Sequence, residues 1–200
     1  SAGWYTEILA PVLKDNGRYI AAVPKVEAGM PEAMKQRDAA FRDKLASGRA
    51  IYGDTTVTAF DAAKPNFAPA GSADMVLTFR NVHNWAKAGN TDAMFKGFFD
   101  SLKKGGVLGV VEHRAKPGTD VKRQVDSGYM TEDYVIEAAE RAGFVLEASA
   151  EINSNRHDTK DYPGGVWTLP PNLRGVSDAD KAKYLEIGES DRMTLRFVKP

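Results

Sequence analysis

The sequence predicts an α/β fold, with a doubly wound, mostly parallel, Rossmann-like sheet that ends in an antiparallel pair of strands. Short apolar runs alternate with amphipathic helical patterns along most of the 200 residues. Two runs, at 74–79 and 107–113, are largely apolar, as in strands that a parallel sheet buries on both faces. The last two strand-like stretches, 144–152 and 193–200, are separated by a long polar loop, which favours an antiparallel pair at the sheet edge.

The first third of the chain predicts two helices and two strands. A helix is expected over 4–15, where apolar residues recur at helical spacing, and the apolar run 18–23 predicts a strand. A second helix is expected over 31–48, because proline is favoured at the first helical position and glycine at the end. The stretch 50–60 predicts a strand, and the Pro- and Gly-rich stretch 63–74 predicts a loop.

Two further helices follow the strand at 74–79. One begins at Thr91 or Asp92 and ends at the "KKGG" of 103–106, and the other spans 131–143 with Thr131 as its cap. The segment 153–192 contains one helix signal, at 177–187, and is otherwise a long polar loop with prolines, glycines and a tryptophan. Loops of this length in compact domains often form lids, so we expect a lid-like insertion here.

Composition and charge exclude several classes of protein. The 27 basic and 27 acidic residues cancel, so nucleic acid is not expected as a partner. Cysteine is absent, which excludes disulfides, thiolate metal sites and cysteine nucleophiles. No apolar run approaches the roughly 20 residues of a membrane span, so no spanning segment is expected. A cytoplasmic protein is expected, although a leader lost from the N-terminus would allow export.

The chain resembles the class I methyltransferases that use S-adenosylmethionine, and more closely the bacterial family of predicted methyltransferases with the motif "GWYTEILAP". The resemblance rests on "GWYTEILAPVLKDNGRYIAA", "ADMVLTFRNVHNW", "LKKGGVLGVVEHRA", "YVIEAAERAGFVLEA", "VWTLPP" and "DRMTLRFVKP", in this order. It implies a single methyltransferase-like domain over 1–200 and S-adenosylmethionine as cofactor. Ser1, Ala2 and Gly3 would end the glycine-rich cofactor loop, with the first, central strand missing upstream of Ser1.

The resemblance also implies a set of cofactor-binding residues, which are Gly3, Trp4, Phe60, Asp61, Arg80 and Asn81. Phe60 would stack on the adenine and Asp61 would accept from its amino group, with Asp54 as a weaker alternative. Asp61 is also typical of a residue that only begins a turn. The second strand ends without the acidic residue that usually holds the ribose hydroxyls, and the nearest carboxylate is Glu27. This departure favours a degenerate cofactor site.

Polar residues crowd the ends of two predicted strands, in "FRNVHNW" and "VVEHRAKPG". In open α/β sheets this edge holds the ligand. His83 is the candidate general base, because an imidazole titrates near neutral pH, and Glu112 is the candidate residue that orients it. The alternative is a structural histidine, with Glu112 paired to Arg80 or Arg114. Arg80 has the chemistry to hold a carboxylate or a phosphate.

Four residues are candidates for substrate binding, namely Trp85, His113, Arg156 and Trp167. Trp85 and Trp167 would wall the acceptor pocket, and the alternative for Trp167 is packing on the sheet edge. Successive strand residues point to opposite faces, so at most one of Glu112 and His113 faces a shared pocket. The three histidines lack metal-ligand spacing, so no metal site is expected.

The expected function is methyl transfer from S-adenosylmethionine to a small-molecule acceptor. An oxygen or carbon acceptor is favoured, because "TLPPN" lies too late in the chain to be the motif of amino-group methyltransferases. The alternative is a non-catalytic member of the fold that binds a nucleoside or a protein partner. A nicotinamide oxidoreductase would need an intact G-x-G-x-x-G motif and an acidic ribose ligand, and neither is visible. The oligomeric state is left open.

Overall fold

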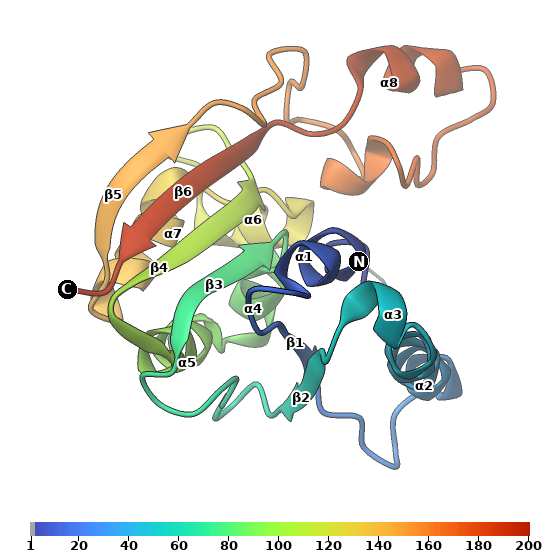
Figure 1. Cartoon of the computed structure of the whole chain (residues 1–200). Helices are drawn as coiled ribbons and strands as arrows, with labels where there is room; N and C mark the ends of the chain where they lie inside the picture. The colour runs from blue at the N-terminus through green and yellow to red at the C-terminus, as the bar shows by residue number, and fades with distance from the viewer. Residues whose placement is uncertain (1–2) are drawn as a thin grey trace. The chain divides into compact units, whose positions relative to one another are not determined.

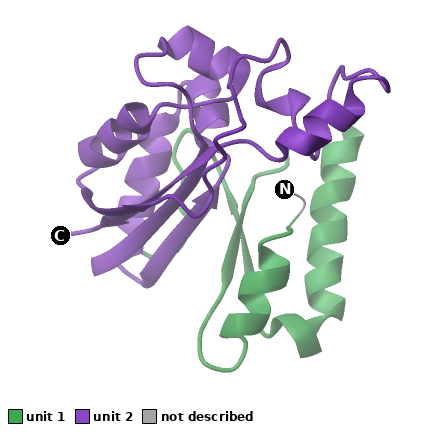
Figure 2. Ribbon diagram, turned by 90° about the horizontal axis from the view of Figure 1, so that it is seen from above, with its two compact units in different colours: residues 1–69 green, residues 70–200 purple. Residues whose placement is uncertain are grey.

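The computed structural model describes residues 3–200, and the chain divides into two compact units, 1–69 and 70–200 (Figure 2). The expectation of one domain over the whole chain stays a prediction. The part of the predicted cofactor loop formed by Ser1 and Ala2 lies outside the described residues.

The first unit pairs two parallel strands and carries three helices. Its elements are α1 (Thr6–Leu13), β1 (Ile20–Pro24), α2 (Glu32–Ser47), α3 (Arg49–Tyr52) and β2 (Thr56–Phe60). The strand predicted over 50–60 is wrong for its first residues, which form α3. Gly48 has a φ of −98° and lets the helical path resume, and Gly53 ends it with a φ of 63°, in the left-handed region that glycine adopts easily.

The second unit contains a four-stranded mixed sheet in the order β3-β4-β6-β5 (Figure 1). Its elements are β3 (Ala73–Phe79), α4 (Val82–Ala88), α5 (Thr91–Ser101), β4 (Leu102–His113), α6 (Val121–Ser127), α7 (Glu132–Arg141), β5 (Val145–Ala150), the 3₁₀ helix η1 (Gly165–Thr168), α8 (Lys181–Ile187) and β6 (Arg192–Val198). β3 runs parallel to β4, whereas β6 is antiparallel to both β4 and β5. The predicted α/β class with an antiparallel C-terminal strand pair is confirmed.

Three details of this unit differ from the sequence prediction. The helices α4 and α6 have seven residues each, too few for a periodic apolar pattern to show in the sequence. Instead, the caps define α6, because the Asp120 side chain accepts from the Arg123 N–H at 2.9 Å. The "KKGG" stretch lies inside β4 rather than at a helix end, with Gly105 at a φ of 76°.

An apolar layer joins the sheet of the second unit to the helices α4, α5, α6 and α7, which lie against one face of it (Figure 1). Alternate residues of β4 point into this layer, and each faces a buried residue of β6. The pairs are Leu108 with Phe197, Val110 with Leu195, and Glu112 with Met193. The buried row of β4 therefore ends on a carboxylate at the edge where the candidate site residues gather.

Arg114, just beyond β4, ties this edge to the long segment before β6. Its guanidinium donates to Asp191 twice, at 3.0 and 2.9 Å, and also to Glu132 and Glu151. Asp191 also lies 2.5 Å from Nζ of Lys160. Burial raises the pKa of Asp191, but hydrogen bonds from Arg114 and Lys160 outweigh it and hold the pKa at about 2.

A second buried contact anchors the same segment. The Tyr129 hydroxyl donates to both carboxylate oxygens of Asp158, at 3.1 Å each, and Asp158 also accepts from the Asp191 N–H at 2.7 Å. Both side chains are buried, and burial raises the pKa of Asp158. The base of the predicted insertion 153–192 is therefore bonded to the sheet edge.

Among the described residues, no helix is both long and apolar enough to cross a membrane.

We expect Asp191→Asn to remove part of the acid sensitivity of the fold. The folded pKa of Asp191 lies below its ordinary value of 3.8, so its stabilising contribution is present above that value and is lost as the pH falls through about 2. The gap in unfolding free energy between wild type and variant should narrow by about 1.5 kcal/mol from pH 5 to pH 2.5, measured by urea denaturation. Asp178→Asn, at an exposed position, serves as control. The prediction is contradicted if the difference in unfolding free energy between wild type and Asp191→Asn is the same at both pH values, as is expected for the control.

Candidate active site

A buried carboxylate organises the end of β4. Glu112 has no exposed surface. Its oxygens accept from the backbone N–H of His83 at 3.3 Å and of His113 at 2.8 Å, and one lies 3.1 Å from Nδ1 of the His83 ring. A buried charged group is costly unless hydrogen bonds compensate it, and these three contacts supply that compensation.

His83 is placed against this carboxylate by α4, whose first turn follows the end of β3. Because the carboxylate faces Nδ1, the ring is oriented with the proton on that nitrogen and with Nε2 as the basic atom. No hydrogen bond to Nε2 is found among the residues that the structure describes. The ring is 6% exposed and lies near two others, with centroid distances of 5.9 Å to Trp167 and 5.6 Å to His113. The predicted base and its orienting carboxylate are thus in contact.

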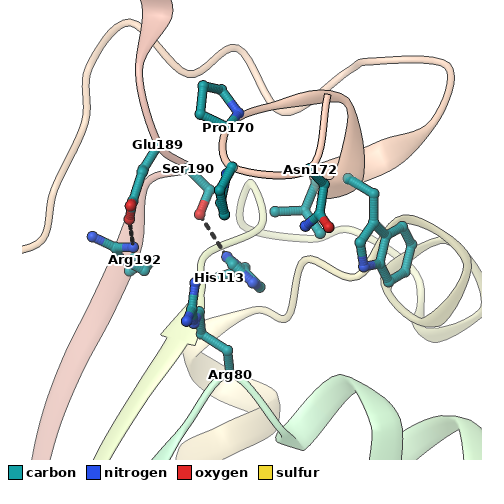
Figure 3. A pocket seen from close by; sticks show the side chains of 10 residues that line it. Arg80, His113, Pro170, Asn172, Glu189, Ser190 and Arg192 are labelled. Carbon is teal, nitrogen blue, oxygen red and sulfur yellow. Dashed lines mark hydrogen bonds and ion pairs between the residues drawn. The ribbon is translucent and has the colours of Figure 1, made fainter. Parts of the chain in front are cut away.

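A small hollow opens beside this pair, within the second unit (Figure 3). It has a volume of about 40 Å³ and is lined by Arg80, His113, Val166, Trp167, Pro170, Pro171, Asn172, Glu189, Ser190 and Arg192. Nδ1 of His113 lies 2.5 Å from the hydroxyl oxygen of Ser190. Burial, with the nearby His83 and the two arginines, lowers the pKa of His113 well below its usual value, so this ring is neutral at pH 7.

The four predicted substrate-binding residues occupy different surroundings. His113 and Trp167 line the hollow, whereas Trp85 packs on Phe95 and Phe98 of α5, with centroid distances of 6.3 and 5.5 Å. Arg156 is exposed in the turn that follows β5 and does not line the hollow. Trp85 is thus explained by packing. The substrate-binding roles of all four stay predictions.

The predicted cofactor residues are divided between the two units. Arg80 lines the hollow of the second unit, where Asn81 precedes α4 and is exposed. In the first unit, Gly3 has a φ of 83°, and a Cβ atom on it would lie 2.5 Å from the ring of Phe41. Packing alone therefore requires glycine at this position. Trp4 is 56% exposed.

Phe60 is the last residue of β2 and Asp61 follows it, next to the end of β1. Phe60 packs on Phe67 with a centroid distance of 4.9 Å, and one oxygen of Asp61 accepts from the Ala63 N–H at 2.9 Å. This bond is the local turn that the sequence offered as the alternative for Asp61. β1 ends at Pro24, and no acidic residue stands there. The adenine-binding roles of Phe60 and Asp61 stay predictions, and the end of β1 lacks the acidic residue that usually holds the ribose hydroxyls.

Three polar residues of the hollow near the start of β6 are not among the predicted site residues, namely Glu189, Ser190 and Arg192. They precede or begin β6, which is antiparallel to β4, so its first residues lie at the carboxyl end of β4. The run "ESDR" directly before the apolar "MTLRFV" was a usable signal, because the sequence already predicted an antiparallel last strand. Within residues 3–200, no group of three or more His, Asp or Glu side chains is arranged to hold a metal.

Comparison with known proteins identifies the fold. No family model and no curated protein matches the chain. A methyltransferase from Aquifex aeolicus, described as SAM (S-adenosylmethionine) dependent, is similar with a TM-score of 0.59 at 13% identity, over 100% of this chain and 78% of that one. The [4+2]-cyclase SpnF gives 0.57 at 19% identity, over 98% and 80%. A SAM-dependent methyltransferase from Methanosarcina mazei gives 0.56 at 10% identity, over 94% and 84%. These identities show a shared fold alone, and membership of the "GWYTEILAP" family stays a prediction.

We expect His83 to carry its proton on Nδ1 in the neutral ring. The Glu112 carboxylate accepts from that nitrogen and fixes this tautomer, which an unconstrained imidazole does not prefer. Nitrogen chemical shifts of the three histidine rings, assigned with His83→Gln, measure it directly. The exposed His157 serves as the internal control. A His83 ring with its proton on Nε2 at pH 7.5 would show that the pair is not arranged for base catalysis.

Proposed function

We propose that this protein is an S-adenosylmethionine-dependent methyltransferase that acts on a small-molecule acceptor. The observation that carries the proposal is the His83–Glu112 contact at the ligand-binding edge of the sheet. The likeness of the fold to methyltransferases over nearly the whole chain supports it. An oxygen or carbon acceptor is favoured, because the only stretch like the amino-group methyltransferase motif, "TLPPN", lies too late in the chain. The base can take the proton that such an acceptor loses when it is methylated.

In the proposed reaction, Nε2 of His83 removes the proton from the acceptor. The cofactor, when bound, would supply an electrophilic methyl group on its sulfonium sulfur. The acceptor's electron pair would form the new bond to this methyl group as the bond from sulfur to methyl breaks, and S-adenosylhomocysteine would leave with that electron pair. Glu112 keeps Nε2 available and stabilises the imidazolium that results, and His83 then releases the proton to water. Trp167 lies beside His83 and would exclude water from the reacting groups.

For the cofactor we propose Gly3, Trp4, Phe60 and Asp61, all in the first unit, and Asn81 stays a prediction of the sequence. The free oxygen of Asp61 would accept from the adenine amino group, and the exposed face of Trp4 would cover the ligand. The missing acidic residue at the end of β1 leaves the ribose without its usual partner, which favours weak cofactor binding. Arg80, the remaining residue of the predicted set, lines the hollow of the second unit.

We expect S-adenosylhomocysteine to bind, and Asp61→Asn to weaken its binding by about tenfold, the effect of one hydrogen bond to a charged group. Asp54→Asn is the matched control. Asp54 is the weaker alternative to Asp61 for contact with the adenine amino group, and its carboxylate already pairs with Arg49. Calorimetric titration measures both, on this chain and on a form extended upstream of Ser1. Binding by neither form would contradict the methyltransferase proposal and favour the non-catalytic alternative.

A further inference from the structure

In the described part of the chain, two arginines that line the hollow are incompletely paired: Arg80 has no carboxylate partner, and Nε of Arg192 is buried without a hydrogen-bond partner. We infer that the hollow binds a carboxylate group of the acceptor, held by Arg80 and Arg192. This inference rests on the proposed function and narrows its substrate class to small organic acids. Figure 3 shows both side chains at the hollow, with His113 between the strand ends that carry them.

Arg80 is held in an uncommon backbone conformation at the end of β3. Its φ of 58° lies in the left-handed region, which is unfavourable for a residue with a side chain. Its N–H donates to the Val111 carbonyl at 2.7 Å, which keeps the residue beside β4. No carboxylate pairs with its guanidinium among residues 3–200. The unfavourable backbone conformation of Arg80 therefore occurs at a half-buried guanidinium that lines the hollow and has no carboxylate partner in the described residues.

Arg192 reaches the same hollow from β6. It is the direct cross-strand partner of His113, so the two side chains stand on one face of the sheet. One of its terminal nitrogens pairs with Glu189, but its Nε is buried and has no hydrogen-bond partner in the described part of the chain. A buried donor without a partner is unfavourable, and a ligand oxygen would remove that cost.

Charge and size favour a carboxylate over a phosphate. Glu189 offsets one of the two arginines, and the lowered pKa of His113 keeps that ring neutral, so the lining carries a net charge of about +1. A singly charged group balances it. The volume of about 40 Å³ exceeds what one water molecule needs, roughly 15 Å³, but it is too small for a large ligand. The planar guanidinium groups match the planar carboxylate.

Two ligands could bring a carboxylate to the hollow, namely the acceptor and the methionine part of the cofactor. The position of the hollow favours the acceptor, because Trp167 forms part of its wall. Trp167 also touches the ring of His83, so an acid anchored here would extend toward the proposed base. An aromatic or aliphatic carboxylic acid meets both features.

The test is a titration of the full chain with benzoate, followed by the arginine Nε–H and histidine signals in NMR spectra. We expect millimolar binding that shifts the signals of Arg80, Arg192 and His113, with no binding of the neutral isostere benzamide. Arg80→Gln and Arg192→Gln should each weaken benzoate binding at least tenfold. Arg196→Gln is the matched control, because Arg196 also lies on β6 and also pairs with a carboxylate, that of Glu147. Equal weakening by all three variants, or no benzoate binding, would overturn the inference, as would tighter binding of inorganic phosphate.

The affinity for S-adenosylhomocysteine, measured in the same variants, tells whether the carboxylate belongs to the acceptor or to the cofactor. It also tests the proposed function separately from the acid site. If the acceptor supplies the carboxylate, Arg192→Gln leaves the affinity for S-adenosylhomocysteine unchanged, and benzoate does not compete with it. Competition, or a loss of affinity in the variant down to that of 5′-methylthioadenosine, which lacks the carboxylate, would overturn the assignment to the acceptor. Benzoate binding without S-adenosylhomocysteine binding would contradict the proposed function while leaving the acid site in place.

Discussion

The site depends on one buried carboxylate. Glu112 occupies the position of an apolar residue in the row that β4 presents to its helices, and it has no contact with solvent. Such a group is tolerated only when its oxygens are fully bonded, so the start of α4 and the end of β4 must stay where their N–H groups reach it. The orientation of His83 follows from the same requirement, because its ring supplies the third contact.

Antiparallel β6 brings the other half of the site to this edge. A parallel strand would begin at the far edge of the sheet, whereas β6 begins beside the end of β4 and sets Arg192 opposite His113. The segment before β6 is bonded to the same edge through Asp158 and Asp191. The hollow is therefore walled by residues that lie about eighty positions apart in the chain.

Arg114 and Arg80, two arginines at this edge of the sheet, differ in how far the protein itself pairs their guanidinium groups. Arg114 meets three carboxylates, those of Glu132, Glu151 and Asp191, and burial leaves it little freedom. Arg80 lines the hollow without any carboxylate partner in the described residues. An arginine that satisfies its donors within the protein stabilises the fold, and one that does not is available to a ligand.

Periodicity and the places where strands end were enough to predict the α/β class, the antiparallel last strand, and the gathering of His83, Glu112 and His113 at one edge. The sequence did not determine which polar residues pair. Helices α4 and α6 are too short to leave a periodic pattern, and Trp85 looks like a pocket wall until its contacts with α5 are known. The roles of Glu189, Ser190 and Arg192 depend on strand register, which joins distant residues through long-range hydrogen bonds. Only the tertiary structure decides such bonds, since local sequence carries no information about a partner far along the chain.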